Sequence, residues 1–160
     1  MIVVSNAGPL IALARIEKLD LLQSLYCQVR IPLAVTSELK GRGEQQYASF
    51  HSVAWLKDVE IKDKMAVALL QESLGAGESE AIVLAMESNA DLLLMDEERG
   101  RRIAVSRQLN LVGTLGILVL AKRRKLIRFV GPLLDELLTS GFRMSADLAR
   151  NVLELAGEGH

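Results

Sequence analysis

The chain contains few residues of the kinds that cross-link small proteins or bind zinc. It has one cysteine, Cys27, and two histidines, His51 and the terminal His160, among 160 residues. A single cysteine excludes an internal disulfide and a cysteine-rich zinc site, and the two histidines have no metal-ligand spacing. A reducing compartment, the cytoplasm, is therefore the expected location.

Long hydrophobic runs and aromatic side chains are also scarce. No apolar run approaches the roughly 20 residues that a membrane-spanning helix requires, so no membrane is expected. The N-terminus lacks the basic segment of a signal peptide, and its first apolar residues suit a strand. Half of the residues are hydrophobic but only 4% are aromatic, which predicts one domain, residues 1–160, with an aliphatic core. The few, scattered aromatics give no sign of a platform on which bases would stack.

Charge is distributed unevenly along the chain, although the formal net charge is only −1. Residues 72–98 contain eight acids and no Lys or Arg, whereas residues 99–128 contain nine Lys or Arg and no acid. A basic surface beside an acidic, metal-binding cleft would suit a phosphodiester substrate, because it attracts the phosphates while the cleft supplies the chemistry. The alternative is that folding spreads these charges over separate solvated faces.

Hydrophobic periodicity predicts strands that alternate with helices. Short aliphatic runs bounded by turn residues predict strands at 2–5, 27–31, 55–61, 92–95 and 111–112. Apolar spacing and caps predict helices at about 8–25, 32–40, 44–50, 64–74, 78–88, 97–108, 115–125, 131–140 and 145–156. This order is typical of an α/β fold with a central, mainly parallel sheet covered on both faces. The apolar C-terminal helices, about 131–156, could serve core packing or an interface.

Polar residues stand where two of the predicted strands end. Asn6 follows the first strand, and Asp96 follows the strand at 92–95. Ligands of parallel sheets bind outside the carboxyl ends of the strands, where both side chains would lie. Glu78 begins the apolar face of its predicted helix, and Glu38 shares a face with the apolar residues three and four positions before it. Carboxylates gathered there could bind a hard cation such as Mg²⁺ or Mn²⁺.

Each of these four residues also has an alternative, purely structural role. Glu78 could interact with the helix dipole, which contributes less than about 1 kcal/mol, and Glu38 could be solvated near the end of its helix. Asp96 could cap the helix that begins after it, worth about 1 kcal/mol, and Asn6 could do the same. Taken singly, these residues are therefore consistent with either a metal-binding role or a structural one.

Together, these residues and their flanking segments resemble the PIN domain over nearly the whole chain. The segments are Ser-Asn-Ala-Gly-Pro-Leu-Ile-Ala-Leu-Ala around Asn6, Val-Thr-Ser-Glu-Leu around Glu38, Gly-Glu-Ser-Glu-Ala-Ile-Val-Leu-Ala around Glu78 and Leu-Leu-Met-Asp-Glu-Glu-Arg around Asp96. With the tail Leu-Leu-Asp-Glu-Leu-Leu-Thr-Ser-Gly-Phe-Arg-Met-Ser, they are most similar to a PIN-like branch related to VapC-type toxin ribonucleases.

The resemblance implies a three-layer α/β/α fold and a hydrolase activity, that of a Mg²⁺- or Mn²⁺-dependent ribonuclease. It places Asn6, Glu38, Glu78 and Asp96 on the family's four acidic metal-binding positions, with Glu97 as the alternative for the fourth. Glu38, Glu78 and Asp96 would be the catalytic residues. The resemblance further implies RNA as the substrate, a small antitoxin protein as a partner and a homodimer.

Basic residues that follow the fourth acidic position are expected to hold the flanking phosphates of the RNA. They are Arg99, Arg101, Arg102, Lys122, Arg123 and Arg124.

The first acidic position departs from the family pattern. Asn6 can offer an amide oxygen to a cation but brings no negative charge, so a second cation should bind less well. Two functions are consistent with this: a metal-dependent single-stranded RNA endonuclease, as in the toxin of a toxin–antitoxin pair, and a catalytically weak PIN-fold module that binds nucleic acid or a partner. A doubly wound nucleotide-binding protein is a distant third, because no Gly-x-Gly-x-x-Gly or P-loop pattern is present.

Overall fold

The structure, a computed structural model, describes residues 1–43, 50 and 53–159. Its sheet is parallel throughout and has the strand order β3-β2-β1-β4-β5. The chain moves outward from β1 through β2 to β3 and then returns to β4 on the other side of β1. This creates a switch point between β1 and β4, and ligands of open parallel sheets bind at such points. The strands are β1 (Val3–Ser5), β2 (Val29–Pro32), β3 (Leu56–Val59), β4 (Leu92–Leu94) and β5 (Leu111–Val112).

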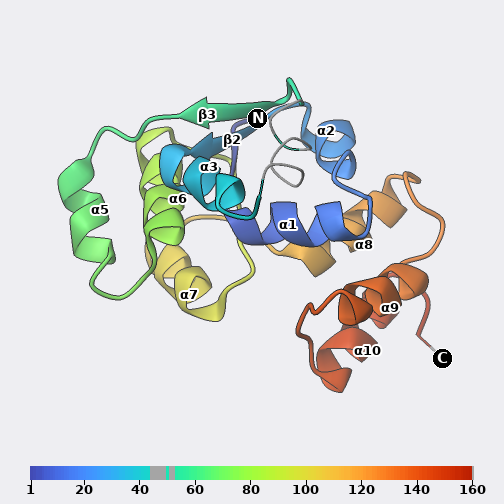
Figure 1. Cartoon of the computed structure of the whole chain (residues 1–160). Coiled ribbons are helices and arrows are strands. Elements are labelled where there is room, and N and C mark those ends of the chain that lie inside the picture. The colour runs from blue at the N-terminus through green and yellow to red at the C-terminus, as the bar shows by residue number, and fades with distance from the viewer. Residues whose placement is uncertain (44–49, 51–52, 160) are drawn as a thin grey trace.

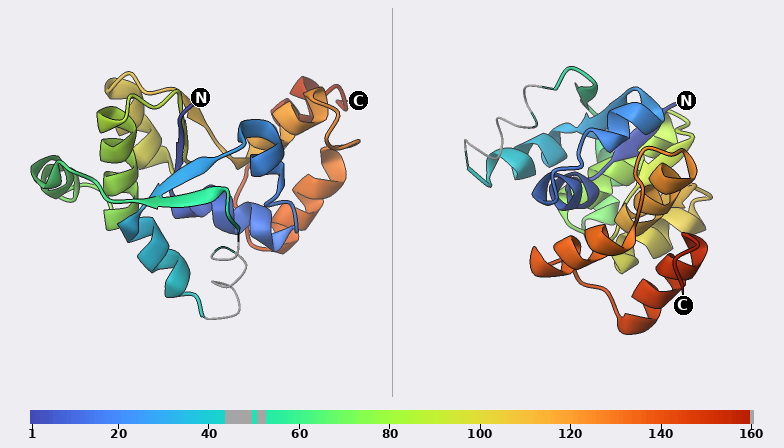
Figure 2. Two further views of the ribbon diagram at one scale, coloured as in Figure 1. Left: turned by 90° about the horizontal axis from the view of Figure 1, so that it is seen from above. Right: turned by 90° about the vertical axis from the view of Figure 1, so that its right-hand side faces the viewer.

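Helices connect the strands and cover both faces of the sheet (Figures 1 and 2). The described helices are α1 (Ala7–Arg15), α2 (Leu21–Tyr26), α3 (Leu33–Lys40), α5 (Lys64–Leu70), α6 (Ala76–Glu87), α7 (Glu98–Ser106), α8 (Thr114–Arg123), α9 (Gly131–Thr139) and α10 (Ala146–Leu155). Figure 1 shows α5 and the α9–α10 pair at opposite ends of the molecule. None of the described helices is long and apolar enough to cross a membrane. The predicted three-layer α/β/α fold is confirmed.

Two aliphatic cores lie on the two faces of the sheet. Val3 and Leu94 point into one core, and their neighbours Val4 and Leu93 point into the other. The first core includes residues of α1, α2, α8, α9 and α10, and the second includes residues of α5, α6 and α7. The four strand residues are at most 1% exposed. Burial on both faces explains why consecutive residues of these strands are aliphatic rather than alternating with polar residues.

The predicted strands are all present within the described residues, but the predicted helix at 8–25 is wrong as a single element. It is two helices, α1 and α2, separated by a turn at which Glu17 has a left-handed φ of 57°. The Lys18 N–H donates to the Leu13 carbonyl at 2.8 Å, which is the closing bond of a Schellman-type helix end. Periodicity could not reveal this break, because Ile16 and Leu19 still pack on the core. The predicted helix at 44–50 falls outside the described residues except for Phe50.

The Glu158 carboxylate ties the C-terminal segment to α8 and to the start of α9. Its Oε2 accepts hydrogen bonds from Lys122 Nζ and Val130 N, each at 2.8 Å, and its Oε1 accepts one from Gly131 N at 3.0 Å. Burial acts to raise the pKa of Glu158, but these three donors outweigh it and hold the pKa below its ordinary value. Glu158 therefore supplies the N-terminal cap that α9 has no local side chain to provide.

Candidate active site at the carboxyl edge of the sheet

Asn6 and Asp96 lie side by side at the switch point of the sheet. Asn6 follows β1, Asp96 follows β4 by two residues, and the two strands are hydrogen-bonded neighbours. A Cβ atom placed on Gly8 would lie 3.7 Å from Asn6 Oδ1 and 3.7 Å from Asp96 Oδ2. Both oxygens therefore face the same small space above the start of α1.

The Asn6 side chain does not perform the capping role that its position suggests. Asn6 is the residue before α1, yet its amide forms no capping hydrogen bond. The residue is 6% exposed, and its Oδ1 is buried without a hydrogen-bond partner among the described residues. A buried acceptor without a donor costs about 1–3 kcal/mol. A cation beside it would satisfy this oxygen.

Asp96 is held by Thr114 at the beginning of α8 rather than by the helix that follows it. Its Oδ1 accepts from Thr114 N at 2.7 Å, and its Oδ2 accepts from Thr114 Oγ1 at 2.6 Å. The residue that precedes α7 is Glu97 and not Asp96, so the structural alternative for Asp96 is not realised in the predicted form. Gly113 permits the arrangement, because a Cβ there would lie 2.7 Å from Asp96 Oδ1.

Glu78 stands in the first turn of α6 and combines a structural role with an electrostatic one. Its Oε2 accepts a hydrogen bond from Gly75 N at 3.4 Å, which closes the start of the helix. Burial, the charge of Glu97 and a hydrogen bond between the two carboxyl groups raise the pKa of Glu78, whereas the Gly75 N–H acts to lower it. Glu80, two residues on, faces another way and accepts from Ala34 N at 3.1 Å, as its helical position predicts.

Glu38 reaches the same place from α3. Its carboxylate packs against Gly77, where an added Cβ would lie 2.5 Å from Glu38 Oε1. Burial raises the pKa of Glu38, the neighbouring Arg42 acts to lower it, and the charge of Glu97 raises it again. Glu38, Glu78 and Glu97 thus repel one another across the gap between α3, α6 and α7.

The glutamates of the site repel one another, but the acids do not converge tightly on one point. Within the residues that the structure describes, no three Asp, Glu, His or Cys side chains lie in an arrangement that could hold a metal ion. Asp96 is turned toward Thr114, and the glutamates face one another. Ion binding would therefore require the glutamate side chains to move, and those of Glu38 and Glu97 belong to exposed residues.

A cleft of about 860 Å³ joins the acidic residues to a largely apolar wall. Asn6, Glu38, Glu78, Asp96 and Glu97 all line it. Its basic lining residues are Arg42, Arg101, Arg123 and Arg143. The Arg101 guanidinium donates to the Met95 carbonyl at 2.7 Å, which keeps it beside Asp96.

Only two of the six predicted nucleic-acid-binding residues line the cleft. Arg101 and Arg123 line it, whereas Arg99, Arg102, Lys122 and Arg124 are not among its lining residues. The Arg99 guanidinium donates to the Ser73 carbonyl at 3.1 Å, and Arg102 lies 3.9 Å from Glu98 on an exposed face of α7. Lys122 pairs with Glu158 at 2.8 Å, and Arg124 is exposed. Their role in nucleic-acid binding stays a prediction.

Sequence reasoning missed four residues that shape this cleft: Thr114, Arg42, Phe142 and Arg143. Thr114 could have been found, because Gly113-Thr114 follows β5 just as Asn6 follows β1. The same rule about strand ends therefore applies to it. Arg42 lies just beyond α3, and Phe142-Arg143 lie between α9 and α10. Only the folded chain brings these three residues to the sheet edge.

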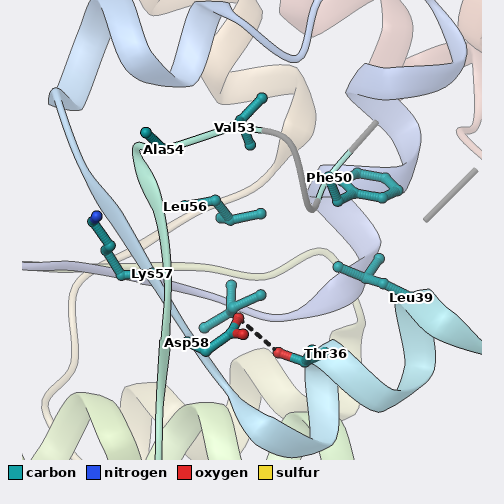
Figure 3. Close-up of a pocket in the computed structure, with 9 residues that line it drawn as sticks. Thr36, Leu39, Phe50, Val53, Ala54, Leu56, Lys57 and Asp58 are labelled. Atoms are coloured by element: carbon teal, nitrogen blue, oxygen red, sulfur yellow. Dashed lines mark hydrogen bonds between the residues drawn. The ribbon is translucent and has the colours of Figure 1, made fainter. Parts of the chain in front are cut away.

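A second cavity, of about 250 Å³, lies between α3 and the edge strand β3 (Figure 3). Its main polar contact is a hydrogen bond of 2.9 Å from Thr36 Oγ1 to Asp58 Oδ1, and the residues around it include Leu39, Phe50 and Leu56. Both polar groups of this pair already satisfy each other. The larger cleft is therefore the candidate site.

The fold and the cleft define a class: an α/β protein with an acidic site at the switch point of a parallel sheet. The chain belongs to the PIN domain family, since a family model described as PIN domain matches residues 2–158. This confirms the family that the sequence segments resemble. PIN domains are generally divalent-metal-dependent nucleases. No curated protein matches the chain.

Proposed function

We propose that this PIN domain protein is a metal-dependent endonuclease that cleaves single-stranded RNA. The observation that carries the proposal is the buried Asn6 Oδ1, which has no hydrogen-bond partner among the described residues and shares a small space with Asp96 Oδ2. An oxygen pair of this kind suits Mg²⁺ or Mn²⁺, which prefer carboxylate and amide oxygens. The surrounding glutamates would supply the remaining ligands, and the cation would relieve their mutual repulsion.

The residues fit a divalent cation in chemistry and charge. The proposed ligands are Asn6, Glu38, Glu78, Asp96 and Glu97. Such an ion polarises a phosphate oxygen and lowers the pKa of bound water. Thr114 holds the Asp96 carboxylate in a fixed orientation, as partners of ligating groups commonly do. Because the first position is Asn6 rather than an acid, one cation should bind more readily than two.

The protein side chains would perform the rest of the reaction. Glu78 lines the cleft beside Asp96 and Glu97, so its carboxylate would either hold the cation or accept a proton from the attacking water. Arg101 would hold the phosphate beside Asp96. Hydrolysis would break the bond from phosphorus to the 3′ oxygen and leave a 5′-phosphate and a 3′-hydroxyl, which is the family's usual outcome.

The test is cleavage of end-labelled single-stranded RNA with Mn²⁺ and with chelator. Glu78→Gln should lose cleavage by about a hundredfold or more, as expected for removal of a group that transfers a proton. Glu72→Gln is the matched control, because Glu72 is exposed and outside the cleft. Cleavage that survives both chelator and Glu78→Gln would overturn the proposal.

A second candidate function is a binding module that cleaves little. The observation that favours it is the lack of three convergent acids among the described residues, together with the neutral Asn6. In that case RNA affinity should scarcely depend on Mn²⁺ or on Glu78. Asn6→Asp should raise cleavage if the site is merely weakened, and should leave it absent if the protein only binds.

We further propose that the protein is the toxin of a toxin–antitoxin pair and acts as a homodimer in the cytoplasm. An exposed apolar residue outside the cleft supports an interface: Leu138, on α9, is 47% exposed. Leu133, Leu134 and Leu137 are buried, so much of the apolar character of these helices serves the core. Sedimentation equilibrium tests the dimer, and a small adjacent gene whose product blocks cleavage tests the toxin role.

A further inference from the structure

The cleft continues well beyond the acidic residues. One face of α8 runs along it, with Leu115, Val119 and Arg123 spaced four residues apart. α8 begins at Thr114, which holds Asp96, and Arg123 is its last residue. At 1.5 Å per residue, Arg123 lies about 13 Å along the helix from the acidic end. A ligand that touches both ends must therefore be longer than one phosphate group.

The opposite wall comes from the C-terminal segment. Leu148, Val152 and Leu155 lie along one face of α10 and line the cleft. Phe142 and Arg143, in the connection between α9 and α10, line it as well. This wall is mostly apolar, which phosphate attraction alone does not require. The wall includes Phe142 and Arg143 of the Gly-Phe-Arg-Met-Ser segment, which supplies none of the acidic residues.

The Phe142-Arg143 connection is fixed by the helix ends on either side. Gly141 has a φ of +100°, and Phe142 N donates to the Leu137 carbonyl at 2.9 Å, which closes the end of α9. Ser145 Oγ accepts from Leu148 N at 3.0 Å, which caps the start of α10. Phe142 and Arg143 are therefore held between two capped helices.

The charges beside this apolar wall are positive and free to interact. Arg123 and Arg143 are exposed, and neither guanidinium forms a hydrogen bond or an ion pair with another residue that the structure describes. An apolar wall next to two such arginines matches the two parts of a nucleotide, an aromatic base and a phosphate. Aromatic side chains stack on the exposed bases of single-stranded nucleic acids.

We propose that Phe142, Arg123 and Arg143 form a subsite for an unpaired nucleotide that flanks the cleavage position. Phe142 and the apolar face of α10 would contact the base, and the two arginines would bind its phosphates. Base faces in a duplex are stacked and covered, so this subsite would select single-stranded RNA. The subsite rests on the proposed nuclease function for its role in cleavage, although its binding of RNA can be measured separately.

Binding in chelator separates the subsite from the chemistry. We would titrate a fluorescent single-stranded RNA and an abasic oligomer of equal length into the full chain, and compete with unlabelled duplex RNA. Phe142→Ala should weaken RNA binding by about tenfold, which corresponds to about 1.4 kcal/mol of stacking, and should leave abasic binding unchanged. Arg143→Gln should weaken binding of both ligands. It should also reduce the number of counterions released on binding, measured from the salt dependence of the affinity, by about one.

Two exposed residues outside the cleft provide matched controls. Phe129 is 55% exposed and Arg128 is exposed, and neither lines the cleft. Phe129→Ala and Arg128→Gln should bind RNA as the unaltered protein does. Circular dichroism melts establish that each variant is folded.

The possible results distinguish the subsite from the nuclease. Cleavage in Mn²⁺ by a Phe142→Ala variant that binds RNA normally would overturn the subsite and leave the nuclease intact. Loss of RNA affinity in Phe142→Ala, in a protein that never cleaves, would support the subsite and overturn the nuclease. Equal binding of duplex, abasic and single-stranded ligands would overturn the subsite, and the apolar wall would then be a protein-docking surface.

Discussion

Thr114→Val tests the contact that holds Asp96 at the candidate site. Thr114 is completely buried, and its hydroxyl donates to Asp96 Oδ2 at 2.6 Å. Valine keeps a similar shape but removes the donor, while the backbone bond from residue 114 to Oδ1 remains. A hydrogen bond to a charged group contributes about 1.5–3 kcal/mol, so we expect the free energy of unfolding to fall by about 2 kcal/mol. For a chain of this size, Tm should fall by about 4–8 °C.

Urea denaturation of a double-mutant cycle isolates the interaction. Asp96→Ala, Thr114→Val and the double variant should show a coupling energy of about 1 kcal/mol or more. Thr36→Val is the matched control. Thr36 is buried and its hydroxyl donates to Asp58, and neither residue lines the candidate cleft. It should lose comparable stability without coupling to Asp96.

The Mn²⁺ response gives an independent readout. Removing a partner that orients a metal ligand typically lowers metal affinity by about 10–100-fold. Thr114→Val should therefore show a much weaker rise of Tm with added Mn²⁺, whereas Thr36→Val should respond like the unaltered protein. A coupling energy near zero, or equal Mn²⁺ responses in the two variants, would refute the reasoning.

Three other changes test the remaining features of the molecule. Asn6→Asp adds a carboxylate beside Asp96, so Tm without metal should fall and apparent Mn²⁺ affinity should rise by about tenfold; calorimetry that shows no change in Mn²⁺ affinity would contradict this. Gly77→Ala would place a Cβ 2.5 Å from Glu38 Oε1, but this oxygen ends a flexible side chain of an exposed residue, so Glu38 should turn aside and stability in urea melts should change by less than about 1 kcal/mol; a larger loss that Glu38→Ala relieves would show instead that Glu38 is held in place. Because its folded-state pKa is depressed, Glu158 stabilises the fold above its unfolded pKa of about 4.3 and loses this effect as pH falls through the folded pKa. The stability difference between Glu158 and Glu158→Gln, about 1 kcal/mol near neutral pH, should vanish in acid, and a difference that persists unchanged would be evidence against the clamp.

The alternation of strands and helices could be predicted from the sequence because it depends on local burial. Leu92–Leu94 must be aliphatic at each position, since both faces of β4 are covered. Pro32 precedes α3 with its φ restricted by the ring, and the Gly41-Arg42-Gly43 segment that ends the helix is visible in the sequence, with Gly43 at a φ of +108°. The break between α1 and α2 was not readable, because Glu17 adopts a left-handed conformation without a glycine and the apolar spacing continues through it.

The strand-end and helix positions of the five candidate ligands, Asn6, Glu38, Glu78, Asp96 and Glu97, could be predicted from the sequence, but the orientations of their side chains could not. Strand ends located Asn6 and Asp96, and the apolar face of its helix located Glu78. The choice of Thr114 as the partner of Asp96 depends on two segments 18 residues apart meeting at one sheet edge. The strand-end rule places Thr114 at this edge of the sheet, but no local pattern shows that it pairs with Asp96.

The sequence by itself determined the parallel α/β architecture, the PIN family and the residues at the carboxyl ends of the strands, because burial and chain geometry act over a few residues at a time. Only the tertiary structure decided which partners those residues meet. In the part of the chain that the structure describes, Asn6 Oδ1 has no donor, Asp96 is turned toward Thr114, and Phe142 and Arg143 line the same cleft as the acidic residues. These outcomes depend on packing between distant segments, and packing is fixed only when the whole chain has folded.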